Sequence, residues 1–403
     1  MNIKHFLIIA AFLTTIGCQD NTPPPIKFTL TNDLDEERTD ELITIEGPLF
    51  QKIMGYEDGR FSIYHDGNPV RFKMQDLDGD GKFDQLFLLQ NFAKKESKEY
   101  EVGKKSQVIF KTPPRTNIHF SAKATPEKQL KTARRLSPAD TIISFYYQME
   151  GPAWENDKVA FRNYFDQRNG IDIFGKQVPQ MVLHKVGIEG QDYHKLSDWG
   201  MDILKVGTSL GAGAIAMKKD GQVHRITGVN STYKFVSGGD RSIFDLDFDG
   251  FAVGENKYNI KHRISIAAGK NYYHSEVSVD GLRGGESLVS GIVNLHSDTL
   301  YTVKESGYTI LYTHAPQAEN GAVLGMALIV PDAGFKGTST APKKGDGITS
   351  TYFVEMGLEQ NKPTDFYFYT GWENQNRSFH ERSFFEKSVR KAVRELAHPI
   401  IIK

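Results

Sequence analysis

The densest group of side chains able to do chemistry lies between Gly151 and Gly213. Acid–base catalysis needs proton donors, proton acceptors and charged groups within reach of one another, and this segment is rich in all three. Its members are Arg162, Tyr164, Asp166, Arg168, Asp172, Lys176, His194, Asp202 and Lys205. His194 follows Tyr193 in a polar, turn-rich stretch, and it is the strongest candidate for a general base because imidazole titrates near neutral pH. His274, two residues before Glu276, is the second candidate.

Residues 157–166 alternate in a way that predicts a strand with Arg162, Tyr164 and Asp166 on one face. Such a face is either a solvated sheet surface, the more common case, or the floor of a polar cleft. Two observations favour the cleft. Trp154 and Trp199 flank the segment and offer indole faces on which sugars stack, and Arg and Lys side chains here would pair with an anion such as a carboxylate or sulfate.

A second motif places four carboxylates in one short loop with a glycine between them. Asp76, Asp78, Asp80 and Asp84 occupy positions 1, 3, 5 and 9, and Gly81 occupies position 6. Calcium takes six to eight oxygen ligands, and glycine lets the loop turn sharply between them. The loop differs from an EF-hand because position 12 is Phe87 instead of Glu. We expect a structural calcium site; an acidic hairpin turn is the alternative.

The amino terminus has the layout of a secretory signal. A basic start at Lys4 precedes an apolar stretch that is too short to span a bilayer, and residues 15–18 (TIGC) resemble the lipobox of bacterial lipoproteins. This pattern predicts a signal peptide over residues 1–17, lipidation of Cys18, and a tether over residues 18–25. We therefore expect a chain anchored through Cys18 to lipid of the outer membrane. An ordinary cleaved signal with an incidental cysteine is the alternative.

The composition favours strands and a soluble protein with a net charge of -1. Aromatic residues make up 11% of the 403 residues and there are 37 glycines, which suits strands and turns. The 49 Lys and Arg nearly cancel the 50 Asp and Glu, so a basic nucleic-acid binder is excluded and no nucleic-acid partner is expected. Because Cys18 is the one cysteine, internal disulfides and thiolate metal sites are excluded as well.

The pattern along the chain predicts a mostly β protein with two domains. Short strand patterns separated by turn residues indicate a smaller N-terminal β-domain over residues 26–112. Two prolines and a charged stretch then predict a linker with a short helix over residues 113–139, and strand patterns resume over residues 140–403. One C-terminal helix is expected, with Ser378 and Glu381 as its capping box and with an apolar stripe that should pack on a sheet.

These motifs together resemble a known family. The Asp76–Asp84 turn, the sequence GPAWEND at 151–157, the Arg162–Lys176 stretch and the sequence WGMDILKVGTSLGAG at 199–213 are similar to lipoproteins of Bacteroidetes polysaccharide-utilisation loci. That family is classed as a domain of unknown function and includes the ulvan oligosaccharide dehydratase. The resemblance implies a galactose-mutarotase-like antiparallel β-supersandwich. It also implies elimination of water from the non-reducing-end uronic acid of a sulfated oligosaccharide, which leaves a 4,5-unsaturated uronyl residue, with no organic cofactor.

The residues can be matched to that chemistry. A base must remove the C5 proton, and we expect His194 in this role, oriented by Asp202 or Asp172. Tyr164 is the alternative base, or the acid that protonates the departing C4 hydroxyl. A cation must stabilise the charge that develops on the uronate carboxylate, for which Arg162, Arg168, Lys176 and Lys205 are available. Trp154 and Trp199 would bind the sugar rings.

Two other functions fit the same residues. A polysaccharide lyase or glycoside hydrolase could use the same cleft, and a non-catalytic glycan-binding lipoprotein would account for the lipobox, the tryptophans and the cations. The number of acid and base groups within one segment favours an enzyme, because binding alone does not need them.

Overall fold

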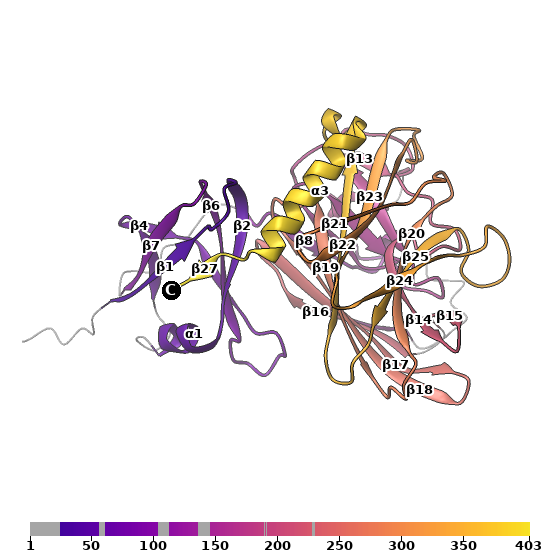
Figure 1. Cartoon of the computed structure of the whole chain (residues 1–403), viewed down its shortest axis with the longest axis horizontal. Coiled ribbons are helices and arrows are strands. Elements are labelled where there is room, and N and C mark those ends of the chain that lie inside the picture. The colour runs from indigo at the N-terminus through magenta and orange to yellow at the C-terminus, as the bar shows by residue number, and fades with distance from the viewer. Residues whose placement is uncertain are drawn as a thin grey trace, which may run out of the picture.

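The computed structural model describes residues 25–55, 61–103, 113–135, 146–188, 190, 192–227 and 230–403. Most of these residues lie in antiparallel sheets, which form a smaller N-terminal domain and a larger sandwich (Figure 1). The predicted mostly β class is therefore confirmed. The predicted signal peptide, Cys18 and all of the tether except Pro25 lie outside the described residues and stay predictions.

The N-terminal domain consists of two small sheets and one helix around a shared core. Its sheets have the strand orders β27-β1-β7-β3-β4 and β2-β6-β5. The strands from this part of the chain are β1 (Ile26–Thr31), β2 (Arg38–Ile45), β3 (Ser62–His65), β4 (Asn68–Val70), β5 (Phe72–Gln75), β6 (Gln85–Phe92) and β7 (Ser97–Gly103). The helix α1 (Gly47–Met54) was not predicted. It begins at a proline-bearing first turn and buries Phe50 and Ile53 in the domain core.

The larger domain is a sandwich of two antiparallel layers. One layer is a nine-stranded sheet of order β21-β22-β23-β26-β19-β18-β17-β16-β9, and the other contains two five-stranded sheets of orders β13-β12-β11-β10-β8 and β15-β14-β20-β25-β24. One hydrophobic core joins all three sheets. The strands are β8 (Thr116–His119), β9 (Thr132–Arg135), β10 (Ala153–Asn156), β11 (Ala160–Asn163), β12 (Ile171–Lys176), β13 (Gly200–Asp202), β14 (Ala212–Lys219), β15 (Gln222–Arg225), β16 (Asn230–Ser237), β17 (Arg241–Val253), β18 (Asn256–Ala267), β19 (Tyr272–Asp280), β20 (Ser287–Val293), β21 (Tyr301–Glu305), β22 (Tyr308–Ala315), β23 (Leu324–Pro331), β24 (Phe335–Thr340), β25 (Thr351–Gly357) and β26 (Thr364–Trp372).

The structure differs from the linker expected over residues 113–139. Within that range β8 pairs with β10 and β9 pairs with β16, so the described part belongs to the larger domain. The expected helix does not form over residues 126–135, because residues 126–128 make a turn, Gln129 pairs with Ser121 in an isolated bridge and residues 132–135 form an edge strand. Pairing partners that are distant in sequence decided this outcome, and local propensity alone does not reveal them.

The predicted C-terminal helix is present and packs on the sandwich as expected. The helix α3 (Arg382–Ala397) buries Phe385, Val389 and Val393 against the nine-stranded sheet. Ser378 is not its cap, because Arg377–His380 form a separate 3₁₀ turn and Glu381 precedes the helix without a side-chain capping bond. After α3 the chain returns to the N-terminal domain, where β27 (Ile401–Ile402) pairs with β1 (Figure 1).

Polar contacts join the two domains at several points. Lys270, in the turn between β18 and β19, contacts Glu41 of β2 at 2.9 Å and Glu395 of α3 at 3.1 Å. Gln75 donates a hydrogen bond to the Ser237 hydroxyl at 2.9 Å.

Within the described residues, no helix is long and apolar enough to cross a membrane.

Candidate functional site

Strands β10 to β13 present a polar face that points away from the main core. Alternation directs Trp154 and Phe161 into that core and places Arg162 and Asp172, which pair across β11 and β12, on the opposite face. The expected surface was either solvated or an open cleft. Instead, side chains of a covering segment (Leu183, Val186, Tyr193 and Trp199) lie on this face and pack on Ala153, Ala160 and Phe174 in a small apolar cluster.

Arg162 is the centre of the polar group and is 1% exposed. Its guanidinium forms an ion pair with Asp172 and a longer one, at 3.3 Å, with Asp202. It also donates to the Tyr164 hydroxyl at 2.6 Å and to the Met149 carbonyl at 3.1 Å. Burial opposes the charged form, but Tyr164 and the two carboxylates outweigh it and hold the pKa of Arg162 well above its usual value.

Tyr164 is held between two guanidinium groups. Its hydroxyl accepts the bond from Arg162 and donates to Asp172 at 2.9 Å. Its ring lies 4.0 Å from the Arg162 guanidinium and 3.6 Å from that of Arg168. Burial is the largest cause that raises the pKa of this hydroxyl, so Tyr164 is protonated at neutral pH, and the Arg162 charge that opposes this shift is what would stabilise a phenolate.

His194 and Asp202 form the surface side of the same group. The imidazole Nδ1 lies 3.7 Å from the Asp202 carboxylate, and the His194 side chain is 66% exposed. Burial, followed by repulsion from Asp172, raises the pKa of Asp202 well above its usual value. Of the two aspartates considered as partners for His194, the structure brings Asp202 to it, whereas Asp172 contacts Arg162 and Tyr164.

Two residues that the sequence analysis missed complete the group. Met149 and Glu150 both have positive φ angles, 56° and 64°, which are unfavourable for residues other than glycine. This conformation places the Met149 carbonyl against Arg162 and the Glu150 carboxylate 3.1 Å from Arg168. Backbone strain of this kind is concentrated at functional sites. A positive φ angle at residues other than glycine leaves no pattern in the sequence, so the sequence contained no signal for them.

Two expected sugar-binding residues are buried and cannot contact a sugar in this structure. Trp154 is 0% exposed and packs against Phe161, Phe244 and Tyr273 in the main core. Lys176 is buried and bonded to Glu155 at 2.7 Å. Both assignments as sugar-binding residues are therefore corrected. Alternation along β10 turns Trp154 into the main core, and the covering segment buries Lys176 on the opposite face.

The expected excess of positive charge is also absent from this group. Arg162 and Arg168 face four carboxylates, which belong to Glu150, Asp166, Asp172 and Asp202. Trp199 is partly buried in the covering segment, and Lys205 is exposed. The second histidine candidate, His274, lies on β19 of the nine-stranded sheet, where Asp365 contacts it at 3.1 Å.

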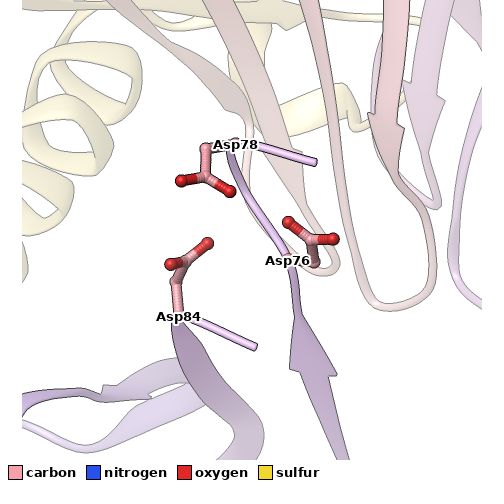
Figure 2. Close-up of side chains that lie close together, drawn as sticks. All are labelled: Asp76, Asp78 and Asp84. Atoms are coloured by element: carbon pink, nitrogen blue, oxygen red, sulfur yellow. The ribbon is translucent and has the colours of Figure 1, made fainter. Parts of the chain in front are cut away.

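The acidic loop between β5 and β6 brings three of its four aspartates together. Figure 2 shows Asp76, Asp78 and Asp84, whose carboxylate oxygens lie within 4.8 Å of one another. Asp80 is outside this group and lies 3.6 Å from Lys82. The carboxylate of Asp76 accepts the backbone N–H of Gly79 at 2.7 Å, the largest cause of its lowered pKa. Three carboxylates supply up to six oxygens, so the group fits calcium, which stays a prediction.

Calcium is expected to stabilise the chain through this loop. At about 100 times its dissociation constant, an ion that binds only the folded state adds about 2.7 kcal/mol to the free energy of unfolding. The gain should disappear in Asp78→Asn and remain in Asp80→Asn, the matched control. Thermal unfolding with calcium and with chelator measures it. An equal melting temperature in both conditions would contradict the site.

Comparison with known proteins places the chain in a family. Residues 30–402 match the model described as "Domain of unknown function (DUF4861)". The chain belongs to this family. One relative of this DUF4861 protein is described as "Uncharacterized protein P7" and comes from Formosa agariphila (strain DSM 15362 / KCTC 12365 / LMG 23005 / KMM 3901 / M-2Alg 35-1). The two sequences are 23% identical over 421 residues, which cover 98% of this chain and 97% of the relative.

A solved structure shares the fold of the DUF4861 protein. It is that of a protein in glycosyl hydrolase family 38 from Enterococcus faecalis, with a TM-score of 0.50 and 8% sequence identity. The similarity covers 94% of this chain, which spans 47% of the length of that protein. At this level of identity the likeness supports the predicted sandwich architecture and does not assign an activity.

Proposed function

We propose that this DUF4861 protein is an oligosaccharide dehydratase that eliminates water from the non-reducing-end uronic acid of ulvan-type sulfated oligosaccharides. One observation carries the proposal. A single nitrogen of Arg162, Nη2, contacts the Tyr164 hydroxyl, Asp172 and Asp202, and Asp202 in turn faces the exposed imidazole of His194. A fixed proton donor and an accessible base therefore belong to one group of neighbouring side chains, as elimination requires.

His194 acts as the base in this proposal. Its Nδ1 faces Asp202, which leaves Nε2 to remove the proton from C5 of the uronate. The electron pair of the broken C5–H bond forms the C4–C5 double bond, and the C4–O bond breaks. Asp202 faces the ring, and the imidazolium that results favours the ionised form of this aspartate, which in turn stabilises the charge on the ring.

Tyr164 acts as the acid. Hydroxide is a poor leaving group, so the C4 oxygen must receive a proton as it departs, and the Tyr164 hydroxyl supplies it to form water. Arg162 is a positioning residue because it is buried and acts through Tyr164. Its positive charge, close to the hydroxyl, also stabilises the phenolate left after the transfer.

Arg168 is the cation best placed for the uronate carboxylate. Its side chain is 40% exposed, and its guanidinium lies 3.6 Å from the centre of the Tyr164 ring. Removing a proton next to a carboxylate places charge on that carboxylate, and a nearby cation stabilises it. The contacts of Arg168 with Glu150 and Asp166 fix its position before substrate binds.

A place at the outer membrane fits the same proposal. Lipidation of Cys18 would hold the enzyme on that membrane, where oligosaccharides arrive from outside the cell. The fold shared with a glycosyl hydrolase family 38 protein supports a carbohydrate ligand at the level of analogy.

The proposal is tested with saturated, uronate-terminated sulfated oligosaccharides. We expect ultraviolet absorbance from the unsaturated uronyl product, together with a mass lower by one water and every glycosidic linkage retained. A lyase would give shorter chains that carry the same chromophore, a hydrolase shorter chains without it, and a binding protein an unchanged mass. Any of these three results would contradict the dehydratase.

A further inference from the structure

A cavity of about 290 Å³ lies where the N-terminal domain, the nine-stranded sheet and the C-terminal segment meet. Its walls come from β2 of the small domain, from β17, β18, β19 and β26 of the sheet, and from α3 and the residues after it. Figure 1 shows α3 running from the sandwich towards the small domain, so these three parts converge there. The volume is at the lower end of the range for pockets that bind small organic molecules.

Arg241, the first residue of β17, lines this cavity. Within the part of the chain that the structure describes, its guanidinium has no hydrogen bond or ion pair. Glu276 and Glu46 act on it only through space, Arg263 opposes them, and burial, the largest influence, lowers its pKa. A largely buried cation without a partner is costly, and buried guanidinium groups are otherwise paired with carboxylates.

Two further hydrogen-bond donors line the cavity. Tyr272 and Tyr367 lie edge to face with ring centroids 5.6 Å apart, and neither hydroxyl has a hydrogen-bond partner among the described residues. Burial raises the pKa of both, so both hydroxyls are protonated at neutral pH. Lys270, by contrast, is paired with Glu41 and Glu395, two carboxylates of the lining that Arg38 and Lys391 also contact. The free positive charge of the cavity is therefore that of Arg241.

The rest of the lining suits a ring-shaped ligand. His274 stacks on Tyr367 at 4.5 Å, which gives a flat aromatic wall, and the other segments add apolar side chains beside the Lys270-paired carboxylates of Glu41 and Glu395. The apolar residues come from β2 and the C-terminal segment: Leu42, Ile43, Leu396, Pro399, Ile400 and Ile402. Such a cavity fits a single ring that carries one negatively charged group, because the ring contacts the walls while the anion meets the donors.

We propose that this cavity binds a small oxyanion, a carboxylate or sulfate ester carried on one sugar-sized ring, with Arg241 as the anion-binding residue and the hydroxyls of Tyr272 and Tyr367 as its hydrogen-bond donors. The site is separate from the Arg162–Tyr164 group, which lies in the other layer of the sandwich. It does not depend on the proposed dehydratase activity. Because three parts of the fold meet at the cavity, the bound anion would also hold them together.

Calorimetric titration of the full mature chain with glucuronate, galactose 6-sulfate and glucose tests this site. The carboxylate and sulfate arms distinguish the two sources of the anion, and glucose is the neutral control. We expect binding of at least one anion and none of glucose, and affinity weakened about 10- to 100-fold in Arg241→Gln, the effect of losing hydrogen bonds to a charged group. Arg283→Gln removes the same charge from an exposed position and should bind like wild type.

Stability without ligand gives a second readout that does not involve binding. Because Arg241 has no partner, Arg241→Gln should unfold at the same or a higher temperature than wild type. A lower melting temperature would show a structural role and overturn the proposal. Equal affinity of wild type and Arg241→Gln, equal binding of glucose, or binding of neither anion at millimolar concentration would overturn it as well. His194→Gln should leave this binding unchanged, so failure of the dehydratase would not be mistaken for failure of this site.

Discussion

Replacing His194 by glutamine is expected to lower kcat for formation of the unsaturated product by about 10²- to 10⁴-fold, the range for loss of a general acid–base group. Glutamine keeps a polar side chain of similar length but cannot accept the C5 proton. Since His194 is mostly exposed, folding should be unaffected, with a change in the free energy of unfolding within about 0.5 kcal/mol. Initial rates of ultraviolet absorbance measure the effect on kcat.

Lys195→Gln, a substitution of the neighbouring residue, is the matched control for His194→Gln. Lys195 is exposed on the same turn and contacts Asp192 at 3.2 Å, away from the Arg162–Tyr164 group. Lys195→Gln should therefore keep the wild-type kcat. If His194→Gln and Lys195→Gln had equal rates, His194 would not be the base.

The second large effect is on stability. Replacing Arg162 by methionine is expected to lower the free energy of unfolding by about 3–5 kcal/mol, the cost of breaking a buried ion pair by removing one partner. The change leaves Asp172 and Asp202 buried together without their shared cation. Urea denaturation of the purified variant measures the loss.

Arg168→Met is the control for Arg162→Met. It removes the same group from a part-exposed position, where ion pairs contribute about 0–1 kcal/mol. If the two variants had equal stability, the buried network would not be held together by Arg162.

Local patterns in the sequence predicted the parts of the site that depend on neighbouring residues. Alternation placed Arg162 and Tyr164 on one face, and the spacing of the acidic loop brought Asp76, Asp78 and Asp84 together. Both features arise within a few residues of chain, where side-chain direction follows backbone geometry.

The remaining features depend on contacts between distant segments. Glu155 fixes the covering segment by accepting the backbone N–H groups of Val182 and Leu183 at 2.9 Å, which closes the polar face over Lys176. The return of β27 to β1 is likewise a pairing across almost the whole chain. Neither contact leaves a periodic signal in the sequence. The polar cleft expected from Trp154, Trp199 and the Arg and Lys side chains is therefore covered in the structure.

The most direct test of the central claim is mass spectrometry of the product formed in ¹⁸O-labelled water from a saturated, uronate-terminated sulfated oligosaccharide. The account predicts a product lighter by one water, with its chain length unchanged and without ¹⁸O, and no such product from His194→Gln. A shortened chain, with or without the label, or an unchanged mass after incubation with the wild-type protein, would contradict it.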